Sequence, residues 1–214
     1  EGVIKKVDKI TNIESIIRSF HSEFCNQEKV ALLVKINKFN TTTEQLRKAY
    51  TENSNHIKQS MRIKSDLKNY CSEVVITENL TPDRINALHK SCHCFITISH
   101  GEAWSIPAFD AMAFGNTPIC SNEGGPKDFI DESDPDTGSL VDGVYSVCNC
   151  PDSAFAHIFT GREEWFEPSE SEAKKKMRYY YENRDSINRK AGIERAKQFN
   201  YEKVANKIKD YLSE

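Results

Sequence analysis

The most informative segment of the chain is Ser99-His-Gly-Glu-Ala-Trp-Ser-Ile-Pro-Ala-Phe-Asp-Ala-Met-Ala-Phe-Gly-Asn-Thr-Pro-Ile-Cys120. It connects two stretches with the character of buried strands. The apolar run 94–98 before it and the run 117–121 at its end predict these strands. Between them, residues 106–114 predict a short helix that Gly115 ends, since glycine accepts a positive φ. This order is a βαβ unit, which places a site at the carboxyl end of the first strand, facing the free amides of the helix.

The loop of this unit combines the N-terminus of a helix with two carboxylates. The first N–H groups of a helix lack partners within it, and the helix dipole adds partial positive charge, so a phosphate is the natural ligand. We interpret the backbone amides of Ser105 and Ile106 as its donors. Glu102 and Asp110 flank this position, and ionised carboxylates accept hydrogen bonds from hydroxyl groups. We therefore predict that Glu102 binds hexose hydroxyls and that Asp110 binds ribose hydroxyls.

Residues 102–119 resemble the E-G-F-G-L-P-x-x-E-A-M-A-x-G-x-P-V-I block of retaining, nucleotide-sugar-dependent glycosyltransferases of family 4, the glycosyl transferases group 1. Residues 123–130, Glu-Gly-Gly-Pro-Lys-Asp-Phe-Ile, are similar to the Gly-Gly loop and the next helix of that family. The chain departs from the pattern at Asp110, where the family has a glutamate, and at Ala103 and Ser105, where it usually has glycines.

The resemblance implies which residues act on the donor. Glu102 and Lys35 are the expected catalytic residues, and Lys35, at the end of the apolar run 30–36, would meet the donor diphosphate. Its alternative is an edge residue whose ammonium reaches water. The family lysine before the first helix falls on Thr11 here, so Lys9 is the candidate that replaces it, or a solvated strand end. The expected donor-binding residues are Lys9, Glu78, Asn79, Leu80, Gly101, Ala103, Trp104, Ser105, Ile106 and Asp110.

The expected fold is α/β: a Rossmann-like three-layer αβα domain with a parallel sheet, one half of a GT-B glycosyltransferase, over residues 1–214 with C-terminal helices from about 169 to 214. The expected strands are 2–7, 30–36, 73–77, 94–98, 117–121 and 144–147. The expected helices are 13–24, two helices between 43 and about 70 with a break near 53–55, one from Pro82, a short one from Pro126, and a closing helix after Asn200.

Composition excludes several classes of function. The 214 residues carry a formal net charge of −3, which gives no reason to expect nucleic acid as a partner, and no apolar run reaches the length of a membrane span. The 7 cysteines, without a secretory signal at the first residues, predict a reduced, cytoplasmic compartment. Cys92-His-Cys94 with His89, and Cys148-Asn-Cys150, lack the spacing of zinc ribbons, so no metal is predicted.

These observations predict the donor-binding domain of a retaining glycosyltransferase that moves a hexose from a nucleoside diphosphate sugar to an acceptor hydroxyl. The resemblance implies no cofactor and no metal. It also implies that the acceptor, a sugar or another hydroxyl compound, binds an N-terminal domain that this chain lacks. The alternative is a non-catalytic, degenerate half-enzyme that acts as a binding module, which Asp110 and Thr11 favour. A dinucleotide oxidoreductase is disfavoured, because no Gly-x-Gly-x-x-Gly follows the first expected strand.

Overall fold

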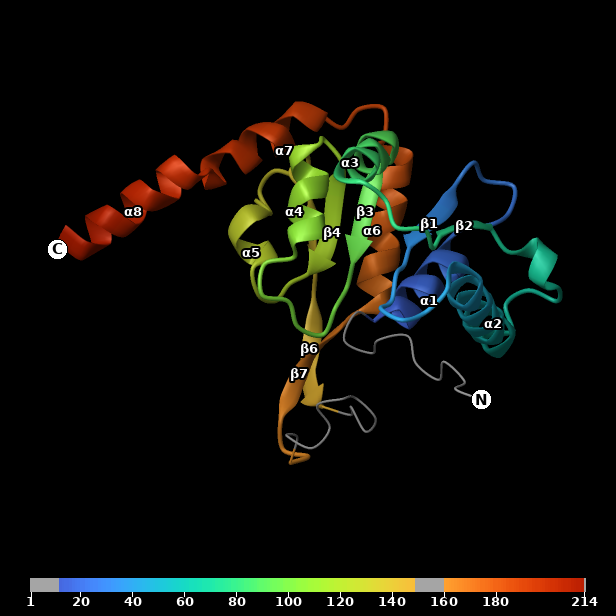
Figure 1. Ribbon diagram of the computed structural model, residues 1–214. Helices are drawn as coiled ribbons and strands as arrows, with labels where there is room; N and C mark the ends of the chain where they lie inside the picture. Colours follow the sequence, from blue (N-terminus) through green and yellow to red (C-terminus); the bar gives the residue numbers. More distant parts are fainter. Residues whose placement is uncertain (1–11, 149–159, 214) are drawn as a thin grey trace.

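Helices and parallel strands alternate through most of the computed structural model, which describes residues 12–148 and 160–213 (Figure 1). Strand β1 (Ala31–Lys35) pairs in parallel with β2 (Ser72–Ile76). Strands β3 (Cys94–Thr97), β4 (Thr117–Ser121) and β5 (Ser139–Val141) form a second parallel ladder in that order. The expected Rossmann-like fold is thereby confirmed. The expected strand 2–7 lies outside the described residues.

The helices lie where the chain crosses between parallel strands. Helix α4 contacts β3 and β4, and α6 contacts β4 and β5 on the other side of the sheet (Figure 1). Helix α1 packs on both α2 and α6. The helices are α1 (Ile13–Glu23), α2 (Thr43–Met61), α3 (Pro82–Ser91), α4 (Ile106–Ala113), α5 (Pro126–Phe129), α6 (Glu170–Glu182), α7 (Arg189–Ala196) and α8 (Tyr201–Ser213), with short 3₁₀ turns at Leu67–Asn69 and Lys197–Phe199.

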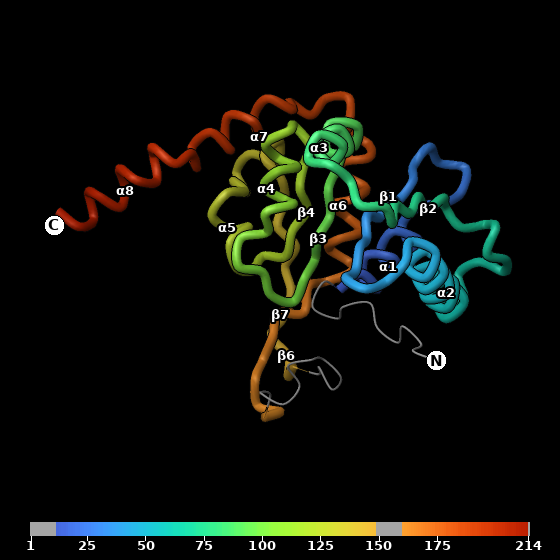
Figure 2. The backbone as a smooth tube through the Cα atoms, viewed as in Figure 1, coloured from blue at the N-terminus to red at the C-terminus, as the bar shows by residue number. Residues whose placement is uncertain are grey.

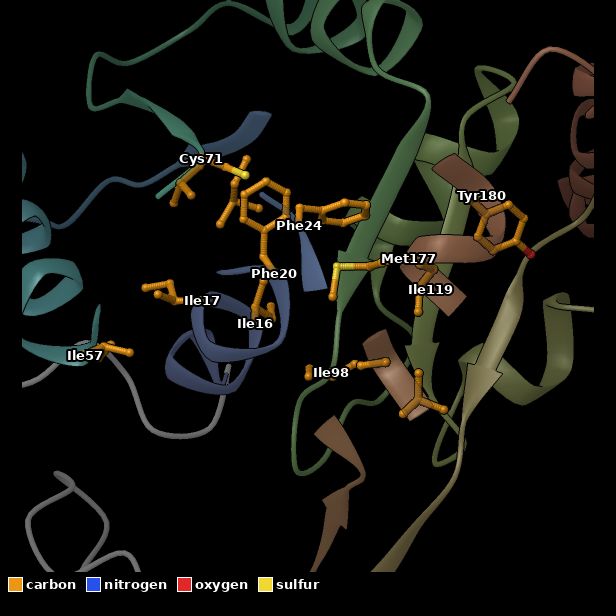
Figure 3. Packing of buried hydrophobic residues seen from close by; sticks show 14 of the residues in the cluster. Ile16, Ile17, Phe20, Phe24, Ile57, Cys71, Ile98, Ile119, Met177 and Tyr180 are labelled. Atoms are coloured by element: carbon orange, nitrogen blue, oxygen red, sulfur yellow. The ribbon is translucent and has the colours of Figure 1, made fainter. Parts of the chain in front are cut away.

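Strand β4 separates two apolar cores. All of its residues are buried, as expected for a parallel strand that helices cover on both faces. Ile119 joins the larger cluster with α1 and α6, shown in Figure 3, whereas Cys120 joins a smaller cluster with α4 and α5. Strand β1 differs from this expectation: only Leu32 and Val34 are buried, so one face alone is covered.

One expectation about a helix is wrong, and strands β5 and β7 (Glu164–Pro168) were not expected. Helix α2 continues through residues 53–55, where a break was expected. The reason is a tertiary contact: Ser54 is buried, and its hydroxyl donates hydrogen bonds to Glu73 of β2. A polar residue is therefore accommodated in the middle of the helix. Strand β7 pairs antiparallel with β6 (Gly143–Val147).

Two elements extend from the body of the molecule. The hairpin β6–β7 begins directly after β5 and projects from the carboxyl edge of the sheet, and α8 extends away on another side (Figure 2). Asn200 caps α8 by accepting a hydrogen bond from the amide of Lys203 at 2.9 Å, as the sequence predicts. Among the described residues, none of the helices combines the length and apolar character that crossing a membrane needs.

Candidate functional site

The loops that follow β3 and β4 pack directly on each other. The amide of Gly125 donates to the carbonyl of Ala103 at 3.1 Å. A Cβ on Gly124 would lie 1.9 Å from the carbonyl oxygen of Glu102, and one on Gly125 would lie 2.3 Å from that of Ala103. The glycines are therefore needed for the contact between the two loops, which form one unit at the carboxyl edge.

Glu102 lies in this unit with a half-buried side chain. Its carboxylate has no hydrogen bond or ion pair with another residue in the described part of the chain. Burial chiefly raises the pKa of the nearby Cys120 thiol, and the negative charge of Glu102 adds to this increase. A half-buried carboxylate without a partner is available to a ligand that brings hydroxyl donors.

Helix α4 begins beside Glu102 with an unusual backbone conformation. Its N-cap residue, Ser105, is buried and has φ 61° and ψ 65°, a left-handed conformation that favours glycine. This explains why a glycine is usual at this place in the family that the sequence resembles. Ile106 and Pro107 follow as the first helical residues, so the amide of Ile106 has no acceptor within the helix. The amides of Ser105 and Ile106, the expected phosphate donors, thus lie at the N-terminus of α4.

Asp110 lies on α4, which contacts α3. Burial lowers the pKa of His89 on α3, and the negative charge of Asp110 opposes that shift. The ring of His89 also stacks on Phe114, with ring centroids 6.1 Å apart and planes 9° from parallel. His89 therefore has a packing role. Within residues 12–148 and 160–213, no group of three or more His, Cys, Asp and Glu side chains has the arrangement of a metal site.

Lys35 ends β1 directly beside Ile76, the last residue of β2. Its half-buried ammonium has no ion-pair partner in the described part of the chain. Figure 1 shows the loop after β1 (light blue) and the loop after β3 on the same lower side of the sheets. The loops that follow Lys35 and β3 thus leave their sheets on the same side of the molecule, whereas Lys9 lies outside the described residues.

A hollow of about 520 Å³ opens beside the loop after β1, and Asn79 lines it together with residues 37–42. Glu78 next to it pairs with Arg47 of α2 at 3.1 Å. Hydrogen bonds from backbone amides, foremost its own, lower the pKa of Glu78, and the charge of Arg47 adds to this. Sequence reasoning missed Arg47, because its contact runs from a helix to the end of a strand and no local motif marks it.

Trp104 differs from its neighbours in the loop. Its indole packs against Phe109, Phe129 and Phe199, with centroid distances of 5.6, 5.4 and 5.4 Å. The side chain therefore belongs to the smaller apolar core. Gly101 and Ala103 are exposed on the same loop, and Leu80 is half-buried after β2.

The fold is that of a GT-B Rossmann-like domain, the class to which the solved structures similar to this chain belong. Residues 58–147 match the family model described as Glycosyl transferases group 1, which confirms the resemblance that the sequence shows. A search of the curated proteins found no match.

Two solved structures illustrate the likeness in fold. Anabaena HepE (Alr3699), in complex with UDP and glucose, is 12% identical with a TM-score of 0.58, over 98% of this chain and 46% of that chain. The catalytic domain of cholesterol-α-glucosyltransferase from Helicobacter pylori is 13% identical with a TM-score of 0.54, over 91% of this chain and 93% of that chain. The chain thus spans about half the length of HepE, with 46% of it covered.

Proposed function

We propose that this chain is the donor-binding domain of a retaining glycosyltransferase that transfers a hexose from a nucleoside diphosphate sugar to an acceptor hydroxyl. The observation that carries the proposal is the unpartnered carboxylate of Glu102 beside the N-terminus of α4. The family match over residues 58–147 supports it, and so does the likeness in fold to HepE, a protein whose crystal structure is a complex with UDP and glucose.

The diphosphate is held by positive groups of the protein itself. The amides of Ser105 and Ile106 donate to one phosphate, and Lys35 supplies a point charge, with Lys9 as a second candidate. As the bond between the anomeric carbon and the diphosphate breaks, these groups stabilise the charge that develops on the leaving oxygen. We propose that they take the place of a metal ion, so that no cofactor is required.

The rest of the donor lies along the same edge. Glu102 accepts hydrogen bonds from hexose hydroxyls and Asp110 from ribose hydroxyls. The base occupies the hollow beside Asn79. It contacts backbone groups of residues 78–80 and not the carboxylate of Glu78, because that carboxylate is already paired with Arg47. Gly101 and the backbone of residues 103–104 complete the loop, since the indole of Trp104 packs in the core.

The acceptor, a sugar or another hydroxyl compound, approaches from a separate N-terminal domain in this proposal. Transfer with retention joins the acceptor oxygen to the anomeric carbon on the face that the diphosphate leaves. We place the protein in the cytoplasm, in line with the absence of a disulfide bond among Cys25, Cys71, Cys92, Cys94 and Cys120 in the described part of the chain.

A second candidate is a binding module without catalysis. Asp110 favours it, because this side chain is shorter than glutamate and its charge acts on His89. Turnover by the full-length protein distinguishes the two candidates.

Donor binding is tested by calorimetric titration of the chain with UDP, GDP and ADP and with their glucose conjugates. At least one pair is expected to bind and to raise the melting temperature. Lys35→Gln should lower the affinity for the nucleoside diphosphate without its sugar by about tenfold, since one charge-assisted contact is lost. The matched control Lys48→Gln removes an exposed lysine from α2 and should leave affinity unchanged. If none of the nucleotides binds wild type, the proposal is wrong.

Catalysis is tested in the full-length enzyme. Glu102→Ala should abolish transfer while the far-UV circular dichroism spectrum and the melting temperature stay as in wild type, because the carboxylate has no partner in the described part of the chain. The control Glu52→Gln removes a carboxylate that is exposed on α2 and should leave transfer unchanged. Unchanged turnover in folded Glu102→Ala would refute the role of Glu102.

A further inference from the structure

His100 connects the loop after β3 to the hairpin β6–β7. It lies two residues before Glu102 and is only 8% exposed. Its ring stacks on the indole of Trp165 of β7, with centroids 3.9 Å apart and planes within 7° of parallel. Its Nδ1 lies 3.0 Å from the carbonyl oxygen of Phe166 and 3.3 Å from Oε2 of Glu167. The side chain of His100, two residues before the candidate carboxylate in the sequence, therefore makes its contacts with the hairpin.

The geometry assigns the proton of this imidazole. Both groups beside Nδ1 are acceptors, a carbonyl and a carboxylate, so Nδ1 carries the hydrogen and donates it. The stack fixes the plane of the ring, and the hydrogen bond fixes its rotation within that plane. Together these contacts join residue 100 to β7.

The hairpin is in turn fixed to the loop after β4. The hydroxyl of Tyr145 on β6 donates to Oε2 of Glu123 at 2.7 Å. The amide group of Asn122 donates to Oδ1 of Asp142, just before β6, also at 2.7 Å. The hairpin therefore contacts both loops of the candidate site.

The contacts of Gly125 and His100 fix the backbone of the loop that carries Glu102. The carboxylate of Glu102 has no partner in the described residues, so its position depends on the backbone that carries it. Gly125 supports that backbone on one side, at Ala103, and His100 anchors it on the other. We propose that His100 is a positioning residue for Glu102, because it locks the loop after β3 onto the hairpin β6–β7. This inference rests on the proposed function, in which Glu102 binds the hexose.

The test compares a nucleotide with its sugar conjugate, because Glu102 contacts only the sugar in the proposal. Wild type and His100→Ala are titrated with UDP and UDP-glucose, or with the GDP or ADP pair if that pair binds wild type. His100→Ala should weaken UDP-glucose by about tenfold, since a small misplacement of a contacting group has this kind of effect. Affinity for UDP should stay within about twofold of wild type. His56→Ala, which removes an exposed histidine from α2, should change neither.

Two further variants separate positioning from folding. His100→Asn keeps a side-chain N–H donor without the ring and should restore part of the loss, and Trp165→Ala should reproduce the loss of His100→Ala. In a Glu102→Gln background, His100→Ala should weaken UDP-glucose no further, because it acts through Glu102. His100→Asn also keeps the test decisive if His100→Ala does not fold, which far-UV circular dichroism shows.

The outcomes are distinct. Equal losses for UDP and UDP-glucose, or additive losses with Glu102→Gln, overturn the positioning role while donor binding stands. Wild type that binds no nucleotide of any pair overturns the proposed function itself.

Discussion

Glu73 belongs to the ladder β1–β2, and Glu102 follows the first strand of the ladder β3–β4–β5. The side chain of Glu73 is only 10% exposed and that of Glu102 is half-buried, and the two carboxylates are used in opposite ways. Glu73, on β2, accepts hydrogen bonds from His21 of α1 and from Ser54 and Lys58 of α2, the latter two at 2.7 and 3.2 Å. Glu102, after β3, has no such partner within the described residues. The carboxylate of Glu73 joins helices to a sheet, whereas that of Glu102 is open to a ligand.

The energetics of Glu73 follow from its surroundings. Burial raises its pKa, but the hydrogen bonds from His21 and Ser54 and the charge of Lys58 outweigh burial and lower the pKa to about 2. The side chains of His21, Glu73 and Lys58 are 0, 10 and 11% exposed. A network this buried is costly to break, because each remaining group loses its partner.

The largest expected effect is the loss of this network. Glu73→Ala leaves His21, Ser54 and Lys58 without their carboxylate, and we expect the free energy of unfolding to fall by about 3–5 kcal/mol. Urea unfolding followed by circular dichroism measures the change. Glu102→Ala is the matched control and should cost less than about 0.5 kcal/mol. Similar losses in both variants would contradict the distinction between the two carboxylates.

Acid should reveal the same contrast. The pKa of Glu73 is about 2 in the folded protein against an ordinary value of 4.5, so its stabilisation is complete above about pH 4.5 and is lost as the pH falls towards 2. The full contribution is about 3 kcal/mol.

The free energy of unfolding should be measured for wild type and Glu73→Gln from about pH 6 down to about pH 2. The advantage of wild type should disappear over this interval, which separates Glu73 from other carboxylates with a lowered pKa such as Glu28. The groups that face Glu73 are His21, Ser54, Lys58 and Tyr50. If the free energies of unfolding of the two proteins differed by the same amount at every pH, the charge of Glu73 would not be the source of the stabilisation.

The smallest expected effect concerns the backbone that supports Glu102. Gly125→Ala would bring a Cβ within 2.3 Å of the carbonyl oxygen of Ala103 and 2.6 Å of Cα of Trp104, so the two loops must separate. We expect a loss of about 1–3 kcal/mol in the free energy of unfolding, again from urea unfolding. Gly101→Ala, whose Cβ meets nothing within 4 Å, is the control in the same site. If the two variants were equally stable, the contact between the loops would not be required.

Local patterns explain why much of this was predictable. Strand β4 matches the expected range, α1 and α4 begin where expected, and Gly115 has the expected positive φ of 80°. Each of these features depends on residues within a few positions of one another, such as an apolar run or a glycine after a helix. The loop of Glu102 follows from the same βαβ pattern.

Contacts between distant segments explain what was missed. His21 and Glu73 are 52 residues apart in the chain, and His100 and Phe166 are 66 apart. From the sequence, Ser54 predicts a helix break, but in the structure it hydrogen-bonds to Glu73 of β2 inside a continuous helix. From the sequence, Trp104 predicts a ligand contact, but in the structure its indole packs against Phe199. No periodicity or motif encodes such pairings.

The βαβ unit, its acidic loop and the family that the loop resembles could be predicted from the sequence, because periodicity, caps and motif spacing are short-range properties. The packing of distant segments sets which carboxylate is paired, which indole joins an aromatic cluster and which histidine contacts the hairpin. Those outcomes depend on side chains that meet only when helices and strands pack, so their partners and burial arise with the fold.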